Sequence, residues 1–219
     1  MHNNVKWKLA QFLELNWWRF YFKDKSKEKY YSDKMKYLLR ILKSLEYTLD
    51  DFTGKNILNA GCGPAGFFIL LNEAKITAVD PLLNRYEKKI EFFNMSDYPN
   101  VKFESISVED FQPEIKYEFI FCINMLDHVR EPEKVIRVFK NVLADEGKVI
   151  VLVDTNKYKL LIKLMNVLPL NPLHPQQLTN EEYINLFKRN NLKPLSNFTF
   201  KKKLLYDYKA MIFIHQKKE

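Results

Sequence analysis

The sequence predicts an α/β protein whose doubly wound, mostly parallel seven-stranded sheet ends in an antiparallel hairpin and carries an N-terminal helical cap. Two observations predict this class. Between residues 54 and 153, short apolar runs typical of strands alternate with segments of helical periodicity, which is the pattern of a parallel sheet with crossover helices. Near the C-terminus, two extended runs follow each other directly, as the strands of a hairpin do.

The helical cap is predicted over residues 1–50 and the α/β domain over residues 51–219. Two helices are expected in the cap, separated near residues 23–27, and neither contains proline or glycine. Steps of four and three residues place an aromatic and polar set on one face of the first helix: Trp7, Gln11, Glu14, Trp18 and Tyr21. The second helix carries an apolar set at similar spacing: Met35, Leu38, Leu39, Leu42 and Leu45.

The strands of the parallel part are predicted at residues 56–60, 76–79, 101–106, 117–123 and 148–153. The last of these runs is almost continuously apolar, as expected of a strand that is covered on both faces of a sheet. Helices are expected from the end of the first strand to Ala74, over residues 84–95, and over residues 133–143, where Gly147 closes the helix.

The C-terminal part begins with a helix that we expect over residues 179–191. Thr179 and Glu182 have the spacing of a capping box, in which each side chain accepts a hydrogen bond from the backbone of the other. The strands of the hairpin are expected over residues 193–202 and 204–215.

Length and composition restrict the class of protein. A chain of 219 residues can bury one sizeable core and a small appendage, but not two full domains. Cys62 and Cys122 lie in apolar, strand-like surroundings, which favours free thiols in a reducing cytoplasm. The apolar runs are too short to cross a bilayer, and the N-terminus has no signal-peptide core. We therefore expect a cytoplasmic monomer or homodimer with no membrane partner.

The formal net charge of +8 bears on nucleic-acid binding. Apart from local clusters at residues 23–29 and 201–203, the lysines are scattered, and arginine, whose planar fork suits phosphates, is scarce. Scattered lysines are typical of solvated faces. The sequence therefore predicts no nucleic-acid partner.

A glycine-rich segment, residues 61–66, separates the first predicted strand from the next helix. Glycines here let the backbone approach a ligand closely and direct N–H groups towards it. Asp80 ends the second predicted strand, where a carboxylate accepts hydrogen bonds from both hydroxyls of a ribose. Together the two features predict a nucleoside cofactor.

Two nucleoside cofactors remain open at this point. The spacing of Gly61, Gly63 and Gly66 matches the dinucleotide fingerprint, so an NAD-dependent oxidoreductase is one alternative. A dehydrogenase of this size is expected to place a Tyr-x-x-x-Lys pair after the glycine loop, whereas Tyr30 and Lys34 precede it. The C-terminal hairpin also fits that class poorly.

Segments of the chain resemble, in order, the motifs of the class I, Rossmann-like S-adenosylmethionine-dependent methyltransferases: residues 57–66, 78–81, 107–111, 117–129 and 147–150. The resemblance covers about residues 52–215, and it lies in the joint order of the motifs rather than in any one of them. It implies a methyltransferase with S-adenosyl-L-methionine as its cofactor. The chain departs from the family at Asn59, where an acidic residue is usual, at Ala65, where glycine is frequent, and at Ser107, where aspartate is frequent.

The resemblance also implies which residues bind the cofactor, and it implies no metal site. The residues implied at the methionine part are Asn59, Gly61, Cys62, Gly63 and Asn124. The residues implied at the ribose and the adenine are Asp80, Pro81, Leu82, Ser107 and Val108.

Two histidines are candidate catalytic bases, although packing roles are equally open for both. His128 follows the fourth predicted strand, at the sheet edge where such folds bind ligands. His174 lies between two prolines in a loop after the fifth strand. An imidazole takes the proton of a hydroxyl acceptor at neutral pH.

The face of the first helix that carries Trp7, Gln11, Glu14, Trp18 and Tyr21 is the candidate acceptor-binding surface, with ordinary core packing as the alternative. The sequence thus predicts methyl transfer to a small-molecule acceptor, with oxygen slightly favoured over nitrogen or sulfur. The alternatives are an RNA or DNA methyltransferase, an NAD-dependent oxidoreductase and a non-catalytic cofactor-binding subunit. The segment 124–127 is not the Asn/Asp-Pro-Pro-Tyr type of tetrapeptide that the nucleic-acid alternative predicts.

Overall fold

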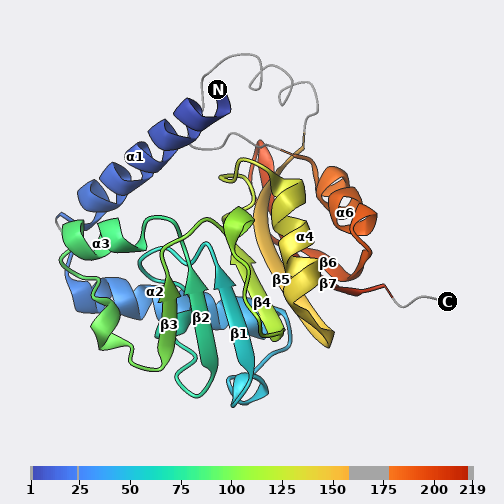
Figure 1. Cartoon of the computed structure of the whole chain (residues 1–219), viewed down its shortest axis with the longest axis horizontal. Helices are drawn as coiled ribbons and strands as arrows, with labels where there is room; N and C mark the ends of the chain where they lie inside the picture. Colours follow the sequence, from blue (N-terminus) through green and yellow to red (C-terminus); the bar gives the residue numbers. More distant parts are fainter. Residues whose placement is uncertain (1, 24, 158–177, 217–219) are drawn as a thin grey trace.

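The computed structural model describes residues 2–23, 25–157 and 178–216 (Figure 1). Its centre is a seven-stranded sheet with the strand order β3-β2-β1-β4-β5-β7-β6. The strands are β1 (Asn56–Ala60), β2 (Lys75–Val79), β3 (Val101–Glu104), β4 (Tyr117–Ile123), β5 (Leu143–Asn156), β6 (Leu192–Lys202) and β7 (Tyr206–His215). The first five strands pair in parallel, and β7 pairs antiparallel with both β5 and β6. The fold class that the sequence predicts is confirmed.

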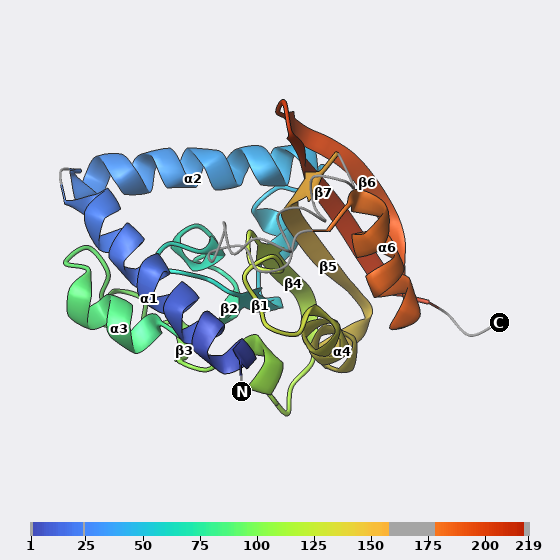
Figure 2. The same cartoon turned by 90° about the horizontal axis from the view of Figure 1, so that it is seen from above.

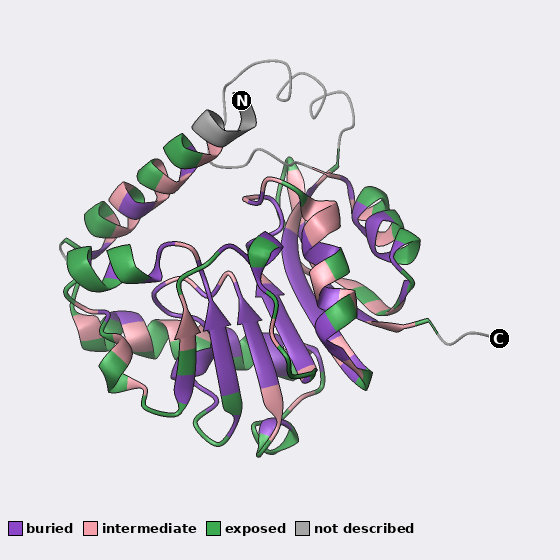
Figure 3. Cartoon of the chain, viewed as in Figure 1, coloured by how far each residue is buried: buried purple, intermediate pink, exposed green. Residues whose placement is uncertain are grey.

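Helices cover both faces of the sheet, as Figure 2 shows. One face packs against α2 (Lys27–Ser44) and α3 (Leu83–Lys89), and the other packs against α4 (Pro132–Val142) and α6 (Asn180–Arg189). Helix α1 (His2–Phe22) adds Leu15 and Phe22 to the first of these cores. Alternate residues of β1 point to opposite faces, so that Ile57 joins the first core and Leu58 the second. Figure 3 shows the central strands buried along most of their length.

Side-chain hydrogen bonds define the first residues of two helices. The capping box of α6 is present, because Glu182 N–H donates to Thr179 Oγ1 over 3.3 Å and Thr179 N–H donates to Glu182 Oε2 over 2.7 Å. Helix α2 begins after Ser26, whose hydroxyl accepts a hydrogen bond from Lys29 N–H. Of the apolar set on α2, Leu38, Leu42 and Leu45 are buried, whereas Met35 and Leu39 are exposed.

Three expectations for local structure are wrong. The helix expected over residues 84–95 ends at Lys89. The segment after the glycine loop forms only a short 3₁₀ turn at Phe67–Ile69 in place of a helix up to Ala74. Residues 67–71 are all buried, and a surface helix would have exposed part of that run. Gly147 does not close a helix, because α4 ends at Val142 and β5 begins at Leu143. A Cβ at Gly147 would lie 2.9 Å from Tyr117 O, so the glycine permits close contact between β5 and β4.

The topology places the functional site. Strand order reverses between β1 and β4, and in open α/β sheets ligands bind beyond the carboxyl ends of the strands at such a point. Helix α1 lies above this edge of the sheet, and α2 crosses beside it (Figures 1 and 2). None of the helices in the described ranges is long and apolar enough to cross a membrane.

Candidate functional site

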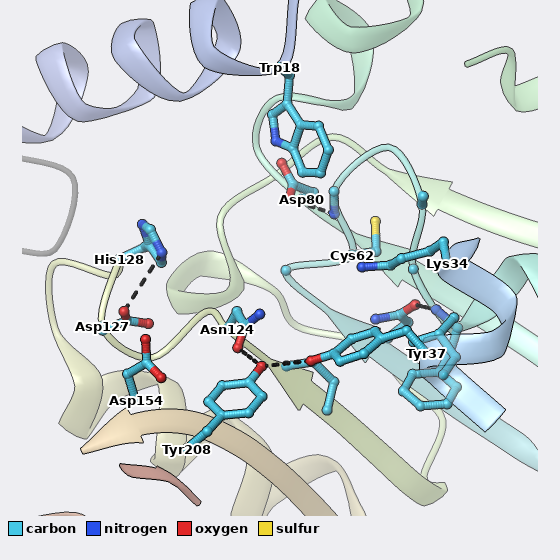
Figure 4. A pocket seen from close by; sticks show the side chains of 18 of the residues that line it. Trp18, Lys34, Tyr37, Cys62, Asp80, Asn124, Asp127, His128, Asp154 and Tyr208 are labelled. Atoms are coloured by element: carbon cyan, nitrogen blue, oxygen red, sulfur yellow. Dashed lines mark hydrogen bonds and ion pairs between the residues drawn. The ribbon is translucent and has the colours of Figure 1, made fainter. Parts of the chain in front are cut away.

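A cavity of about 1030 Å³ opens at the reversal point of the sheet (Figure 4). Its walls come from the glycine loop, the carboxyl ends of β2, β4 and β5, helices α1 and α2, and the β6–β7 hairpin. A smaller pocket of about 70 Å³ lies beside it, between α1 and the segment after β3. Glu14, Gly61, Asp80, Asn124 and His128 border both spaces, so the two are neighbouring parts of one site.

The glycine loop presents its backbone to the cavity. Gly61 and Gly63 have φ angles of 61° and 57°, a region that side chains disfavour. A Cβ at Gly61 would lie 2.2 Å from Met125 Cγ, whereas a Cβ at Gly63 would meet only Trp18 at 3.9 Å. Gly61 is therefore required by packing beneath the loop, and Gly63 leaves open space where a ligand can approach.

Asp80 is buried and fixed by the backbone around it. Its Oδ2 accepts a hydrogen bond from Gly63 N–H at 3.0 Å, and its Oδ1 accepts one from Leu82 N–H at 2.8 Å. Burial, followed by the nearby charge of Glu14, raises the pKa of Asp80 to about 7. Glu14 itself accepts a hydrogen bond from Tyr86 Oη at 3.2 Å. A carboxylate is thus held ready at the end of β2, facing an acidic residue of α1.

The smaller pocket gathers the residues that were expected at the adenine. Pro81, Ser107 and Val108 line it, together with Trp7 and Gln11 of α1. Leu82 lines neither space and packs in the core, so of the two candidates only Pro81 borders the pocket.

Asn59 lines the large cavity next to the glycine loop. It is buried, and its Oδ1 accepts a hydrogen bond from Phe67 N–H at 2.6 Å. The amide therefore secures the turn that follows the loop. Cys62 also lines the cavity, and burial raises the pKa of its thiol well above the ordinary value.

Asn124 belongs to a chain of hydrogen bonds that sequence reasoning did not find. Its φ angle is 53°, and its Oδ1 accepts a hydrogen bond from Tyr208 Oη. Tyr208 Oη lies 3.0 Å from Tyr37 Oη, so the chain joins β7 to α2 across the cavity (Figure 4). Burial raises the pKa of both tyrosines, which keeps them neutral at physiological pH. These residues lie 171 positions apart in the sequence, and no local pattern brings them together.

His128 borders both spaces, and its Nε2 lies 3.7 Å from Oδ2 of the buried Asp127. The pair stands just beyond β4 and faces the cavity, as expected of His128 (Figure 4). His174, the other candidate base, lies outside the described residues.

The acceptor face predicted on α1 divides between the two spaces. Trp18 and Tyr21 line the large cavity, whereas Trp7 and Gln11 line the smaller pocket beside Ser107. Glu14 borders both. Lys34 of α2 also lines the large cavity, and the sequence had not marked it as a site residue.

Comparison with known proteins gives a match to a family model described as a methyltransferase domain, over residues 27–197. A tRNA U34 carboxymethyltransferase of Campylobacter jejuni is 27% identical over 111 residues, which are 49% of this chain and 37% of the relative. A ubiquinone biosynthesis O-methyltransferase of Chromobacterium violaceum is 28% identical over 99 residues, 43% of this chain and 42% of the relative. The matched region is thus about two fifths of the length of these curated relatives.

Two solved structures share the fold. The N-methyltransferase NodS of Bradyrhizobium japonicum, in complex with S-adenosyl-l-homocysteine, superposes with a TM-score of 0.59 at 14% identity and covers 90% of this chain and 91% of its own. A 1,6-didemethyltoxoflavin-N1-methyltransferase of Burkholderia thailandensis, with S-adenosylhomocysteine and its acceptor bound, superposes with a TM-score of 0.60 at 13% identity and covers 99% of this chain and 90% of its own.

Proposed function

The chain belongs to the S-adenosylmethionine-dependent methyltransferase family, and from that premise we propose that it transfers a methyl group to a small-molecule acceptor, with oxygen favoured over nitrogen or sulfur. The observation that carries the proposal is that the large cavity and the smaller pocket share lining residues and so form one site. Two carboxylates, Glu14 and Asp80, border both the narrow pocket and a cavity of about 1030 Å³. Pockets for drug-sized ligands have volumes of roughly 300–1,000 Å³, so the combined site has room for a cofactor and a second small molecule.

The residues of the site suit S-adenosylmethionine. When bound, the cofactor supplies a methyl group activated by a sulfonium. The ionised Asp80 would accept hydrogen bonds from the ribose hydroxyls, and the open backbone at Gly63 would border the methionine part. Pro81 and Val108 would contain the adenine in the smaller pocket.

The acceptor would occupy the remaining part of the large cavity, between α2 and the hairpin. Tyr37, Phe200 and Tyr208 line that part, and Trp18 and Tyr21 of α1 line the cavity as well. Aromatic side chains bury large apolar areas while offering a polar tip, so this wall suits an acceptor with an apolar ring or chain. Methyl transfer is a displacement that depends on alignment, and such a wall aligns the acceptor and excludes water.

His128 is the proposed general base for a hydroxyl acceptor. Its imidazole faces the cavity, and the neighbouring Asp127 carboxylate orients the ring and stabilises it once it carries the proton. Nitrogen and sulfur acceptors need less help from a base, because an amine or thiolate is already nucleophilic. Oxygen is therefore the acceptor atom that makes most use of this pair.

Ligand binding and acceptor labelling test the proposal. S-adenosylhomocysteine should raise the melting temperature, because a ligand at 100 times its Kd stabilises the native state by about 2.7 kcal/mol. NAD and NADP should not, and stabilisation by NAD alone would contradict the cofactor assignment. Methyl-labelled cofactor incubated with separated metabolite and RNA fractions should label the metabolites. Label in the RNA fraction alone would instead establish a nucleic-acid acceptor.

A further inference from the structure

Lys34 stands in the cavity wall opposite the glycine loop. It lies on α2, one turn after Tyr31, whose hydroxyl stands between Phe92 O at 3.1 Å and Pro64 O at 3.5 Å and so places α2 beside the loop. Figure 4 shows the Lys34 side chain directed across the cavity towards Cys62. The ammonium group therefore faces the backbone that borders the proposed methionine part of the cofactor.

This ammonium has no anionic partner in the part of the chain that the structure describes. The ion pairs found there involve other cations, and the interaction found for Lys34 Nζ is with the Tyr37 ring, 5.4 Å from its centroid. Burial lowers the pKa of Lys34 to about 8, because removal of water disfavours the charged form of the amine. Withdrawing a charge from water is unfavourable unless an opposite charge compensates it, and a bound anion would do so.

The glycine loop itself contributes no carboxylate on this side. Asn59 at the end of β1 is neutral, and its Oδ1 already accepts the Phe67 N–H. The wall beside the loop thus combines a neutral amide with a cation. Its charge complements a carboxylate and not an ammonium group.

We infer that Lys34 forms an ion pair with the carboxylate of the cofactor's methionine part. That part carries both an ammonium and a carboxylate group, and this chain binds it through the carboxylate. The inference rests on the proposed cofactor and makes Lys34 a specificity-determining residue. It selects ligands that retain the amino-acid end of the cofactor over ligands that have only the thioether nucleoside.

The experiment measures by calorimetry how tightly the wild-type protein and the Lys34→Met variant each bind two ligands. S-adenosylhomocysteine carries the carboxylate, and 5′-methylthioadenosine has the same nucleoside and sulfur without the amino-acid end. Lys34→Met should weaken binding of S-adenosylhomocysteine roughly 10- to 100-fold, the usual range for a charge-assisted hydrogen bond, and leave 5′-methylthioadenosine unchanged. Lys36→Met is the matched control, because Lys36 is exposed on the same helix and should affect neither ligand. Lys34→Arg should restore part of the selectivity.

The pH dependence of the wild-type protein gives a second measurement that needs no variant. In the free protein Lys34 loses its proton near pH 8, and a paired carboxylate would raise that pKa in the complex. Affinity for S-adenosylhomocysteine relative to 5′-methylthioadenosine is therefore fully present below pH 8 and falls by about tenfold per pH unit above it. The same pH series with Lys34→Met measures the part of the pH dependence that comes from the ligand's own amino group.

Other titratable groups do not produce this difference. The neighbouring Tyr30, Tyr37, Cys62 and Tyr208 have raised pKa values and stay neutral in this range. The Lys34→Met protein retains the remaining charged groups of the cavity, so its pH profile is the baseline for them as well: Glu14, Arg40, Asp80, Asp127, His128, Asp154, Lys201 and Lys203.

Three outcomes overturn the inference. An unchanged affinity of Lys34→Met for S-adenosylhomocysteine would mean that the ammonium serves another ligand, such as the acceptor. Equal weakening of both ligands would mean that Lys34 only shapes the wall. If neither ligand binds the wild-type protein, the proposed cofactor is wrong and the inference is wrong with it, a result distinct from the other two. The variant should fold, because it removes a desolvated charge, and its melting temperature checks this.

Discussion

Replacing Asp80 with asparagine tests the proposed ribose site, because the substitution keeps the size of the side chain and removes its charge. Each carboxylate oxygen accepts one backbone N–H, at 3.0 and 2.8 Å, and keeps a lone pair for a ribose hydroxyl. A hydrogen bond to a charged group contributes about 1.5–3 kcal/mol, and the existing bonds reduce what the ligand gains. We therefore expect Asp80→Asn to weaken S-adenosylhomocysteine binding by about 1–3 kcal/mol, roughly 5- to 150-fold in Kd.

The same residue predicts a pH dependence whose direction follows from its raised pKa. Ribose hydroxyls donate to the ionised carboxylate, and protons compete with them below the pKa of about 7 that burial and Glu14 produce. Affinity should be fully present above pH 7 and fall as the pH drops below it, by up to about tenfold per pH unit. The D80N protein has no such group and should lack this dependence.

Calorimetry with S-adenosylhomocysteine between pH 5.5 and 8 measures both effects. Asp145→Asn is the matched control, since Asp145 is exposed at the start of β5 and lines neither the cavity nor the pocket. Wild-type affinity in D80N at pH 7.5 would refute the assignment of the ribose to this carboxylate. If D80N loses affinity but the wild-type affinity does not change with pH, the inference that burial and Glu14 raise the pKa of Asp80 is refuted.

Three further substitutions follow from the contacts of the site. Glu14→Gln removes the charge facing Asp80, so the pH below which S-adenosylhomocysteine affinity declines should move lower; calorimetry showing an unmoved midpoint would contradict this. His128→Gln should reduce turnover of a hydroxyl acceptor about 10²- to 10⁴-fold with cofactor affinity nearly unchanged, and near-normal turnover would exclude a base role. Tyr208→Phe removes a hydrogen bond to Asn124 and should lower the free energy of unfolding by about 0.5–1.5 kcal/mol in urea denaturation. Tyr206→Phe, at a half-buried site, should cost less.

The sequence predicted those parts of the fold that depend on residues close together along the chain. The β1–loop–β2 unit was predictable because apolar runs, glycines at 61 and 63 and an aspartate at the strand end each have one common structural meaning. The capping box at Thr179 was predictable for the same reason. The helix expected after the glycine loop was wrong because residues 67–71 are buried on a sheet face shared with α2, a tertiary effect that outweighs local propensity.

Sequence analysis did not identify Lys34, Tyr37 and Tyr208 as site residues, and the reason is a different one. Lys34 and Tyr37 appear in sequence as ordinary positions of an amphipathic helix, and Tyr208 as one position of a hairpin strand. Their common cavity exists only once β7 pairs with β5 and α2 packs on the same face of the sheet as Tyr208. The Tyr37–Tyr208–Asn124 hydrogen bonds and the place of the Lys34 ammonium in the cavity wall are therefore products of topology. A search for motifs along the chain has no means of finding them.

The division of the α1 face has a consequence for how the proposed reaction is organised. Trp7 and Gln11 border the pocket proposed for the adenine, and Trp18 and Tyr21 border the space proposed for the acceptor. Glu14 lies between them and faces Asp80. One helix would thus border both proposed ligands, so a ribose held between Asp80 and Glu14 would also set where Trp18 stands in the cavity wall. On this arrangement cofactor binding shapes the acceptor wall, and substitutions at Glu14 affect both ligands rather than the acceptor alone.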